Sequence, residues 1–464
     1  MPSQLKLSKV VPLYKKGDKS EPNNYRPISL LSIFDKILEK LIHKRLMHFI
    51  NKNDILYENQ FGFRPKHSTN LAVLELIDTI YQNLDKKHYV AGIYLDLKKA
   101  FDTVDHDILL HKLYIYGIRG KPWEWFKNYL KDRQQYLVIN DCISTCRKIH
   151  YGVPQGSVLG PLLFLLYIND INFAVAEDTL KLYADDTNLF LHDSDINLLC
   201  RRANRSLESL YQWFLANKLT LNFDKTLYSV FSPNKAADTS SFKLHLNNLE
   251  IQRVDCCKYL GVMLDDRLTW QNHINYIENK LIKFTSFFYK IRQNLTAECR
   301  KALYFALIHP HLTYAVELFG NATASSIYRL QILQNKFLRI LQLQGPRFPT
   351  SKLYVNYNTH KICDLHEISL LQLIHKIIYQ PCELPKPFRT YLIFAHTVHE
   401  HDTRHKTDVF PHHVNSSYGT KNFKFKSHIL WNNLPEEIKQ VRNIVAFQTK
   451  LKNYYFVKYC CNTT

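Results

Sequence analysis

Two adjacent aspartates, Asp185 and Asp186, interrupt the stretch TLKLYADDTNLFLH (179–192), which otherwise has the composition of a β-strand. Burying one carboxylate without a partner is costly, and burying two neighbours costs more. The pair is therefore expected at the turn of a strand–turn–strand unit. A second apolar stretch, YVAGIYLDL (89–97), predicts a strand that ends near Asp96. If these strands are neighbours in one sheet, three carboxylates converge at one edge.

Such a concentration of negative charge calls for cations. Hard oxygen ligands favour Mg²⁺, which binds one or two carboxylates together with waters and substrate phosphates. Two such ions can clamp an in-line displacement at phosphorus, one at the attacking 3′-hydroxyl and one at the pyrophosphate leaving group. The alternative is that each aspartate is a solvated turn residue, since Asp is a common turn former. That alternative weakens when all three lie at strand ends within apolar stretches.

The composition indicates a folded protein that meets a polyanion. The 464 residues are 46% hydrophobic, and the formal net charge is +20 with a pI of about 9.3. Nucleic acid is the first candidate partner, a membrane surface the second, and an ordinary basic protein the alternative. No stretch of about 18 residues is apolar throughout, so no membrane span is expected. Ten cysteines without a CxxC pair or a regular framework indicate a reducing, intracellular compartment.

Glycine is scarce, with 12 in 464 residues, yet three lie within GVPQGSVLG (152–160). Such a cluster indicates a backbone that turns sharply or comes close to another group. Apolar residues at helical spacing predict helices over 31–53 and 68–87. Residues 346–464 are less periodic and rich in His and Lys, apart from a helix-like stretch at 435–455.

Several of these stretches follow one another in the order of reverse transcriptase motifs. Motifs A, B and C correspond to IYLDLKKAFD (93–102), GVPQGSVLGPLLFLLYIND (152–170) and YADD (183–186). Finger motifs correspond to NYRPISLLS (24–32) and NQFGFRPKHST (59–69). Motif D and the primer-grip region correspond to NKLTLNFDKT (217–226) and KYLGVMLDDRLTW (258–270). The chain resembles the reverse transcriptases of non-LTR (LINE-type) retrotransposons, nearest the jockey/CR1-like group.

The resemblance implies an α+β right-hand polymerase with fingers, palm and thumb and a mostly helical C-terminal region. We expect fingers and palm over 1–270, a thumb-like basic helical region over 271–345, and a C-terminal region of undefined role over 346–464. Nothing in the sequence corresponds to the endonuclease that precedes the polymerase in complete elements, so we expect a chain that lacks it.

The implied activity is RNA-directed DNA polymerisation, in which a DNA 3′-hydroxyl is extended on an RNA template from dNTPs. It requires two Mg²⁺ ions, for which Mn²⁺ can substitute. The expected location is nuclear or cytoplasmic; the family uses nicked chromosomal DNA as primer, which implies nuclear action. Two other readings compete: a non-catalytic nucleic-acid-binding remnant of a truncated element, and a viral-type RNA-dependent RNA polymerase. The second usually has GDD in place of YADD.

The resemblance also assigns the catalytic positions. Asp96 and Asp185 are expected as the principal metal ligands, together with the backbone carbonyl of Leu97. Asp186 is expected as the third catalytic carboxylate and a further metal ligand, whose main contribution is to hold the geometry of the site. Support of the turn and of the primer end is expected from Tyr183, Ala184, Tyr259, Leu260 and Gly261.

Further residues are expected around the nucleotide. Phe101 matches the bulky gate that would exclude a ribose 2′-hydroxyl, although a core phenylalanine is the competing interpretation. Gln155 and Gly156 fit the loop beside the incoming nucleotide. The expected phosphate contacts are Arg26, Arg64 and Lys36, each with an ordinary surface cation as its alternative, and Lys225 is placed to protonate pyrophosphate.

Basic residues alternate with aromatic ones in the expected thumb. Contacts with the nucleic-acid backbone are expected from Lys280, Lys283, Lys290 and Arg292, with a solvated helix face as the alternative. Six histidines lie within HTVHEHDTRHKTDVFPHH (396–413), and the stretch contains no Cys. A loop that touches RNA or solvent is therefore expected there in preference to a zinc site.

Overall fold

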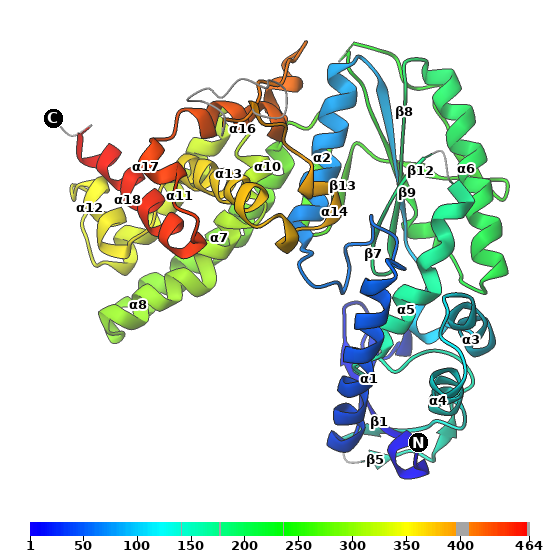
Figure 1. The fold of residues 1–464 in the computed structure, drawn as a ribbon. Coiled ribbons are helices and arrows are strands. Elements are labelled where there is room, and N and C mark those ends of the chain that lie inside the picture. The colour runs from blue at the N-terminus through cyan, green and yellow to red at the C-terminus, as the bar shows by residue number, and fades with distance from the viewer. Residues whose placement is uncertain (141, 176–177, 235, 396–407, 462–464) are drawn as a thin grey trace.

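The computed structural model describes residues 1–140, 142–175, 178–234, 236–395 and 408–461. Two sheets with their covering helices form one part of the molecule, and a mostly helical region that includes the C-terminal third lies beside it (Figure 1). The expectation of an α+β fold with a mostly helical C-terminal region is confirmed by this arrangement.

The central sheet has five strands in the order β12-β9-β3-β8-β7. Their bounds are β3 (Tyr89–Leu95), β7 (Thr179–Tyr183), β8 (Asp186–Asp193), β9 (Leu227–Phe231) and β12 (Gln252–Arg253). β3 pairs antiparallel with both β8 and β9. Successive side chains of β3 enter different cores, because Ile93 and Leu95 join one apolar cluster and Tyr94 joins the other.

A helix covers each face of this sheet (Figure 1). On one side lies α6 (Ile196–Ala216), whose buried stripe Leu199, Ala203, Leu207, Leu210 and Phe214 recurs at helical spacing. On the other side lies α2 (Thr69–Asp85), which begins at Ser68, whose side chain accepts a hydrogen bond from the Leu71 N–H. The strands are buried on both faces, and this explains why their sequences are almost continuously apolar.

The second sheet, near the N-terminus, has the strand order β2-β1-β4-β5, and β6 also pairs with β4. Its strands are β1 (Leu7–Tyr14), β2 (Tyr25–Leu30), β4 (Gln134–Ile139), β5 (Cys142–Ile143) and β6 (Arg147–Lys148). The helices of this part are α1 (Ile33–Lys52), α3 (His106–Ile115), α4 (Lys121–Leu130) and α5 (Gly160–Ile168). A hairpin of β13 (Cys256–Tyr259) and β14 (Val262–Asp265) leads into the helical region, and β10 (His245–Leu246) pairs with β11 (Leu249–Glu250).

The helical region contains α7 (Gln271–Ile291), α8 (Ala297–Leu303), α9 (His309–Thr313), α10 (Val316–Phe319), α11 (Ala324–Leu341), α12 (Thr350–Tyr357), α13 (Ile362–Tyr379), α14 (Lys386–Arg389), α16 (Phe423–Asn432), α17 (Glu436–Lys439) and α18 (Ile444–Cys461). The single helix expected over 435–455 is thus two, α17 and α18. The break has a local cause, because the Asn443 side chain accepts the N–H groups of Val445 and Ala446 and starts α18.

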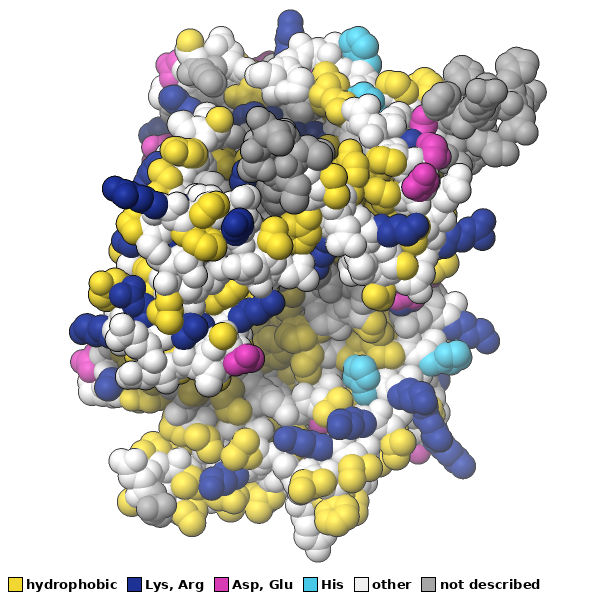
Figure 2. All heavy atoms as spheres, turned by 90° about the vertical axis from the view of Figure 1, so that its left-hand side faces the viewer, with side chains coloured by type: hydrophobic (Ala, Val, Ile, Leu, Met, Phe, Trp, Pro, Cys, Tyr) yellow, Lys and Arg dark blue, Asp and Glu magenta, His cyan; other side chains and the backbone are white. Residues whose placement is uncertain are grey.

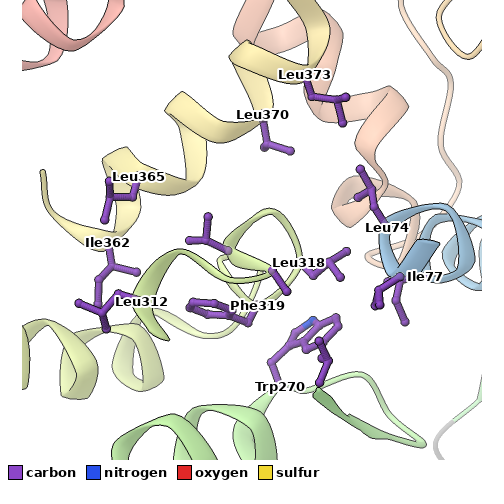
Figure 3. Packing of buried hydrophobic residues seen from close by; sticks show 14 of the residues in the cluster. Leu74, Ile77, Trp270, Leu312, Leu318, Phe319, Ile362, Leu365, Leu370 and Leu373 are labelled. Atoms are coloured by element: carbon purple, nitrogen blue, oxygen red, sulfur yellow. The ribbon is translucent and has the colours of Figure 1, made fainter. Parts of the chain in front are cut away.

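One apolar cluster joins α2 to the helical region. Leu74 and Ile77 of α2 lie with Leu318 of α10 and Leu370 of α13 in this cluster (Figure 3). Trp270, at the start of α7, is fully buried, and its indole N–H donates to the Tyr81 hydroxyl at 3.0 Å. The C-terminal region therefore shares its core with the helix that backs the central sheet.

Candidate active site

The register of the central sheet brings the three predicted aspartates to one edge. β7 and β8 form a hairpin in which Tyr183 pairs with Asp186, so Ala184 and Asp185 make the turn. Leu95 of β3 pairs with Thr187 of β8, and the same antiparallel register places Asp96 opposite Asp186. Directly opposed residues of neighbouring strands have Cα atoms roughly 4.5–5.5 Å apart.

The electrostatics of this edge disfavour three charges without cations. Partial removal from water raises the pKa of Asp185, and the charge of Asp96 raises it further, while Arg26 and Lys15 oppose this effect. Asp186 still reaches solvent, yet loss of hydration followed by the charges of Asp185 and Asp96 raises its pKa to about 6. The carboxylates are therefore close enough to repel one another.

The donor set at this edge consists of oxygen atoms, which fits a hard divalent cation. No three His, Cys, Asp or Glu side chains in the described ranges form a ready-made metal cluster. Mg²⁺ does not require one, because it keeps waters and takes substrate phosphates as ligands. Asp96 uses only Oδ2 in its described side-chain hydrogen bonds, which come from Asn222 at 3.0 Å and Lys225 at 3.1 Å. Its Oδ1 is available to a cation.

The backbone beside Asp96 is fixed by the neighbouring strand segment. The Asn222 N–H donates to the Asp96 carbonyl, and the Lys98 N–H donates to the Thr220 carbonyl, both at 2.8 Å. Leu97, between them, is bridged to Leu221, and no described backbone hydrogen bond uses its carbonyl. This leaves the Leu97 carbonyl open, as the expected ligand role requires.

The turn that carries the aspartates is held by the loop 59–69, through Gln60 and Gly62, to which the sequence analysis assigned no role. Ala184 has a left-handed backbone (φ 56°), and its N–H donates to Gln60 Oε1 at 3.0 Å. The same oxygen accepts the Gly62 N–H at 2.8 Å. A Cβ on Gly62 would lie 2.3 Å from the Ala184 nitrogen, so only glycine fits. The available signal was this glycine, in NQFGFRP, within a glycine-poor chain.

The glycine-rich loop after β6 packs against β2. The Ser29 N–H donates to the Gln155 carbonyl at 2.7 Å, and the Gln155 side chain donates to Asp102 at 2.9 Å. Gly156 has φ 117°, and a Cβ there would meet the Ser29 carbonyl oxygen at 2.6 Å. The expectation of a close backbone approach at Gly156 therefore has a physical cause in this contact.

Phe101 lies between the two loops. Its ring stacks on Phe164 of α5 at 4.7 Å between centroids, and it meets the Phe63 ring edge-on at 6.2 Å. Phe63 belongs to the loop that supports the turn. Because Phe101 is only half-buried, it combines core packing through Phe164 with a face that remains accessible. Its role as a gate stays a prediction.

A buried carboxylate on α1 fixes the far side of the glycine-rich loop. Glu39 accepts the Val158 N–H at 2.6 Å and the Tyr129 hydroxyl at 2.5 Å. Next to it, Asp35 pairs with Arg133 at 3.5 Å, and all of these charged side chains are shielded from solvent. Burial first, and then the charge of Glu39, raises the pKa of Asp35 to about 6. Sequence reasoning did not identify Glu39.

The residues that were predicted to contact phosphates lie in different parts of the structure. Arg26 and the unpredicted Lys15 lie near enough to influence Asp185, and Lys225 contacts Asp96. Lys36 sits half-buried in the first turn of α1. Arg64 donates to the carbonyls of Tyr57 and Gln60, at 2.8 and 3.2 Å, and burial lowers its pKa. Arg64 is thus a support of the loop and is not brought together with the carboxylates.

The expected primer-grip residues form the β13–β14 turn. Leu260 (φ 43°) and Gly261 (φ 85°) are both left-handed, and the Tyr314 hydroxyl donates to the Leu260 carbonyl. Burial, followed by the charge of Asp186, raises the pKa of Tyr259. Burial and then Tyr314 and Asp186 likewise raise the pKa of Tyr183. The hairpin therefore lies next to the carboxylate edge.

The basic residues that are expected to contact the nucleic-acid backbone lie on two surfaces of α7. Lys280 lies 4.5 Å from the centre of the Tyr276 ring, and Lys258 of β13 donates to the Tyr276 hydroxyl at 3.2 Å. Lys290 and Arg292 instead line a groove between α7 and α11, of about 1270 Å³. Lys283 is exposed. Figure 2 shows the side of the molecule that lies to the left in Figure 1. Lys and Arg side chains are spread over this side and around a recess in it, and acidic side chains are few.

Residues 396–407 of the stretch 396–413 lie outside the described residues. Within the described parts of the chain, none of the helices is both long and apolar enough to cross a membrane.

Sequence comparison identifies the class of protein to which this site belongs. Residues 14–264, more than half of the chain, match the family model described as "Reverse transcriptase (RNA-dependent DNA polymerase)". The chain belongs to this family.

Its similar relatives come from non-LTR retrotransposons, as the sequence motifs predicted. The chain is 31% identical over 357 residues to the "Probable RNA-directed DNA polymerase from transposon BS" of Drosophila melanogaster. It is 29% identical over 352 residues to the "RNA-directed DNA polymerase from mobile element jockey" of the same organism. Each match covers 73% of this chain but 38% of the relative, so the chain spans well under half the length of these proteins.

Among solved structures, similarity was found to "Structure of apo telomerase from Candida Tropicalis". The TM-score is 0.42 with 11% sequence identity, and the match covers 77% of this chain and 66% of that one.

Proposed function

We propose that this chain is an RNA-directed DNA polymerase that extends a DNA 3′-hydroxyl on an RNA template, as in a non-LTR retrotransposon. The observation that carries the proposal is the convergence of Asp96, Asp185 and Asp186 at one sheet edge in a member of the reverse transcriptase family. The raised pKa values of Asp185 and Asp186, to which the charge of Asp96 contributes, are those of a site that is completed by cations.

The family implies a divalent metal, and the residues present fit it. Asp96 Oδ1, Asp185 and the Leu97 carbonyl would hold the ions, with Asp186 adding negative charge beside them. When bound, two Mg²⁺ ions, or Mn²⁺ in their place, would neutralise charge on the carboxylates and on the triphosphate. Lys225, which contacts Asp96, would donate a proton to the departing pyrophosphate.

The surrounding residues support a nucleotide and a nucleic-acid duplex as substrates. The Gln155–Gly156 loop is fixed against β2, so its backbone is preorganised beside the carboxylate edge. The accessible face of Phe101 would exclude a 2′-hydroxyl and select dNTPs. The cations around Tyr276 would hold phosphates of an RNA–DNA duplex near the β13–β14 turn. A chromosomal DNA primer would place this reaction in the nucleus.

The test is primer extension on an RNA template with dNTPs or rNTPs at several Mg²⁺ concentrations. We expect Mg²⁺-dependent extension with dNTPs and a strong preference over rNTPs. A preference for rNTPs would contradict the proposal in favour of an RNA-dependent RNA polymerase. Salt-sensitive RNA binding with no extension at any Mg²⁺ concentration would instead indicate a non-catalytic remnant.

A further inference from the structure

A cavity of about 260 Å³ is lined in part by residues 64–67 of the loop that supports the aspartate turn. Three segments line it: the end of α1 with the residues that follow, the loop residues 64–67, and residues 382–389 around α14. The cavity is therefore built where the C-terminal region meets the first hundred residues of the chain. Gln60 and Gly62 of the same loop contact Ala184.

The cavity is lined by four Lys and Arg side chains, of which the two lysines form ion pairs and the two arginines do not within the described residues. Lys66 pairs with Glu383 at 2.8 Å, and Lys386 pairs with Asp54. In the described parts of the chain, neither Arg64 nor Arg389 forms an ion pair with a carboxylate. The charges of Asp54 and Glu58 reach Arg64 only at longer range, and Arg389 opposes them. Two guanidinium groups therefore share one small cavity, and neither pairs with a carboxylate of the described residues.

Backbone carbonyls hold these two side chains in place. Arg64 donates through Nη1 to Tyr57 and Gln60, and Arg389 donates through Nε to the Leu384 carbonyl at 3.2 Å. These contacts occupy one side of each guanidinium and leave other N–H groups available. A planar guanidinium with free N–H groups suits the forked recognition of a phosphate.

A third group in the lining also lacks a partner. His67 Nδ1 is 2.8 Å from the Pro65 carbonyl, which assigns the proton to Nδ1. His67 Nε2 is shielded from water and has no hydrogen-bond partner within the described residues. Burial, followed by the charges of Arg64 and Arg389, lowers the pKa of His67 to about 4. An anion in the cavity would offset the charges of Arg64 and Arg389 on His67, although not its burial.

We propose that this cavity binds a phosphate group between Arg64, His67 and Arg389. The group is either inorganic phosphate or one phosphodiester of a single-stranded RNA, since both offer the same oxygens. Occupancy would tie α14 to the loop 60–67 and so stabilise the contact of this loop with the aspartate turn. The site lies apart from the carboxylate edge and does not depend on polymerase activity.

The test is thermal unfolding of the full chain with inorganic phosphate, against chloride at equal ionic strength, and with a short single-stranded RNA. Arg389→Gln removes one guanidinium, and Arg347→Gln is the control because Arg347 is exposed and lies outside the lining. We expect phosphate or RNA to stabilise wild type and Arg347→Gln in a concentration-dependent manner. Arg389→Gln should need at least tenfold more ligand for the same shift.

The two ligands separate the two sources. If inorganic phosphate stabilises wild type and Arg389→Gln weakens this effect, the cavity is a site for free phosphate. If only RNA stabilises the chain, the cavity is a site for a phosphodiester. Arg389→Lys keeps the charge and should lose affinity severalfold because it lacks the fork. The proposal is overturned if both Arg389 variants respond to phosphate and RNA as Arg347→Gln does.

Discussion

Replacing Gly62 by alanine should disable the aspartate turn through a single methyl group. The new Cβ would lie 2.3 Å from the Ala184 nitrogen and 2.9 Å from the Tyr183 carbonyl carbon, whereas ordinary contact begins at 3.4 Å. Both atoms are backbone, so the turn or the loop must move by about 1 Å. Such overpacking costs about 1–3 kcal/mol of stability. A displacement of about 1 Å at reacting groups costs roughly 100-fold in rate.

The assay is single-nucleotide extension of a primer on an RNA template, with circular dichroism and thermal unfolding of the same samples. We expect kcat to fall about 100-fold in Gly62→Ala, with little change in primer–template affinity. Gly345→Ala is the matched control, because a Cβ at Gly345 meets nothing within 4 Å. A folded Gly62→Ala variant with the wild-type rate would refute the idea that this contact positions Asp185 and Asp186.

Three further predictions concern groups around the same edge. The pKa of Asp186 is about 6 in the folded chain and about 3.9 in the unfolded chain. Its ionisation therefore destabilises the metal-free folded state as the pH rises from about 4 to 6. Asp186→Asn should therefore have the higher Tm in EDTA above pH 6, with a gap that closes towards pH 4. Glu39→Ala leaves the Val158 N–H unpaired, so it should lower stability by about 1–3 kcal/mol and raise the KM for dNTP. Glu39→Gln keeps an oxygen acceptor and should retain most of the wild-type stability and dNTP affinity. Phe101→Ala should increase rNTP incorporation at least tenfold in the extension assay without loss of dNTP use.

The carboxylate edge was predictable from sequence because its determinants are local. Strand composition on both sides of the aspartate pair fixed the hairpin, and the same reasoning placed Asp96 at the end of β3. Helical spacing over 31–53 and 68–87 predicted α1 and α2, which the structure places at 33–52 and 69–85. Periodicity of this kind follows from backbone geometry and needs no knowledge of distant contacts.

The supports of the site were not predictable in this way, because they depend on long-range contacts. Gln60 reaches Ala184 across 124 residues, and Glu39 reaches Val158 across 119. No local sequence pattern indicates that the carboxylate of Glu39 is buried and accepts a hydrogen bond from a backbone N–H far along the chain. Arg64 matched a family motif, yet its surroundings, not its type, direct it to the carbonyls of its own loop.

The C-terminal region shows the same limit. Its helices present little periodicity over 346–464 because α13 is buried on several sides, against α10, α16 and α18. The contacts of Asp78 with Phe423 and Tyr391 further attach this region to α2. Such a shared core cannot be read from the spacing of residues within one segment.

The central claim is that the three aspartates at the sheet edge catalyse DNA synthesis on RNA. The most direct test compares Mg²⁺-dependent primer extension by wild type with that by an Asp185→Asn, Asp186→Asn double variant. Asp193→Asn, at the other end of β8, is the control for charge loss on the same strand. We predict extension by wild type and Asp193→Asn and none by the double variant. If wild type and the double variant are both folded and extend equally, or are equally inactive, the account is contradicted.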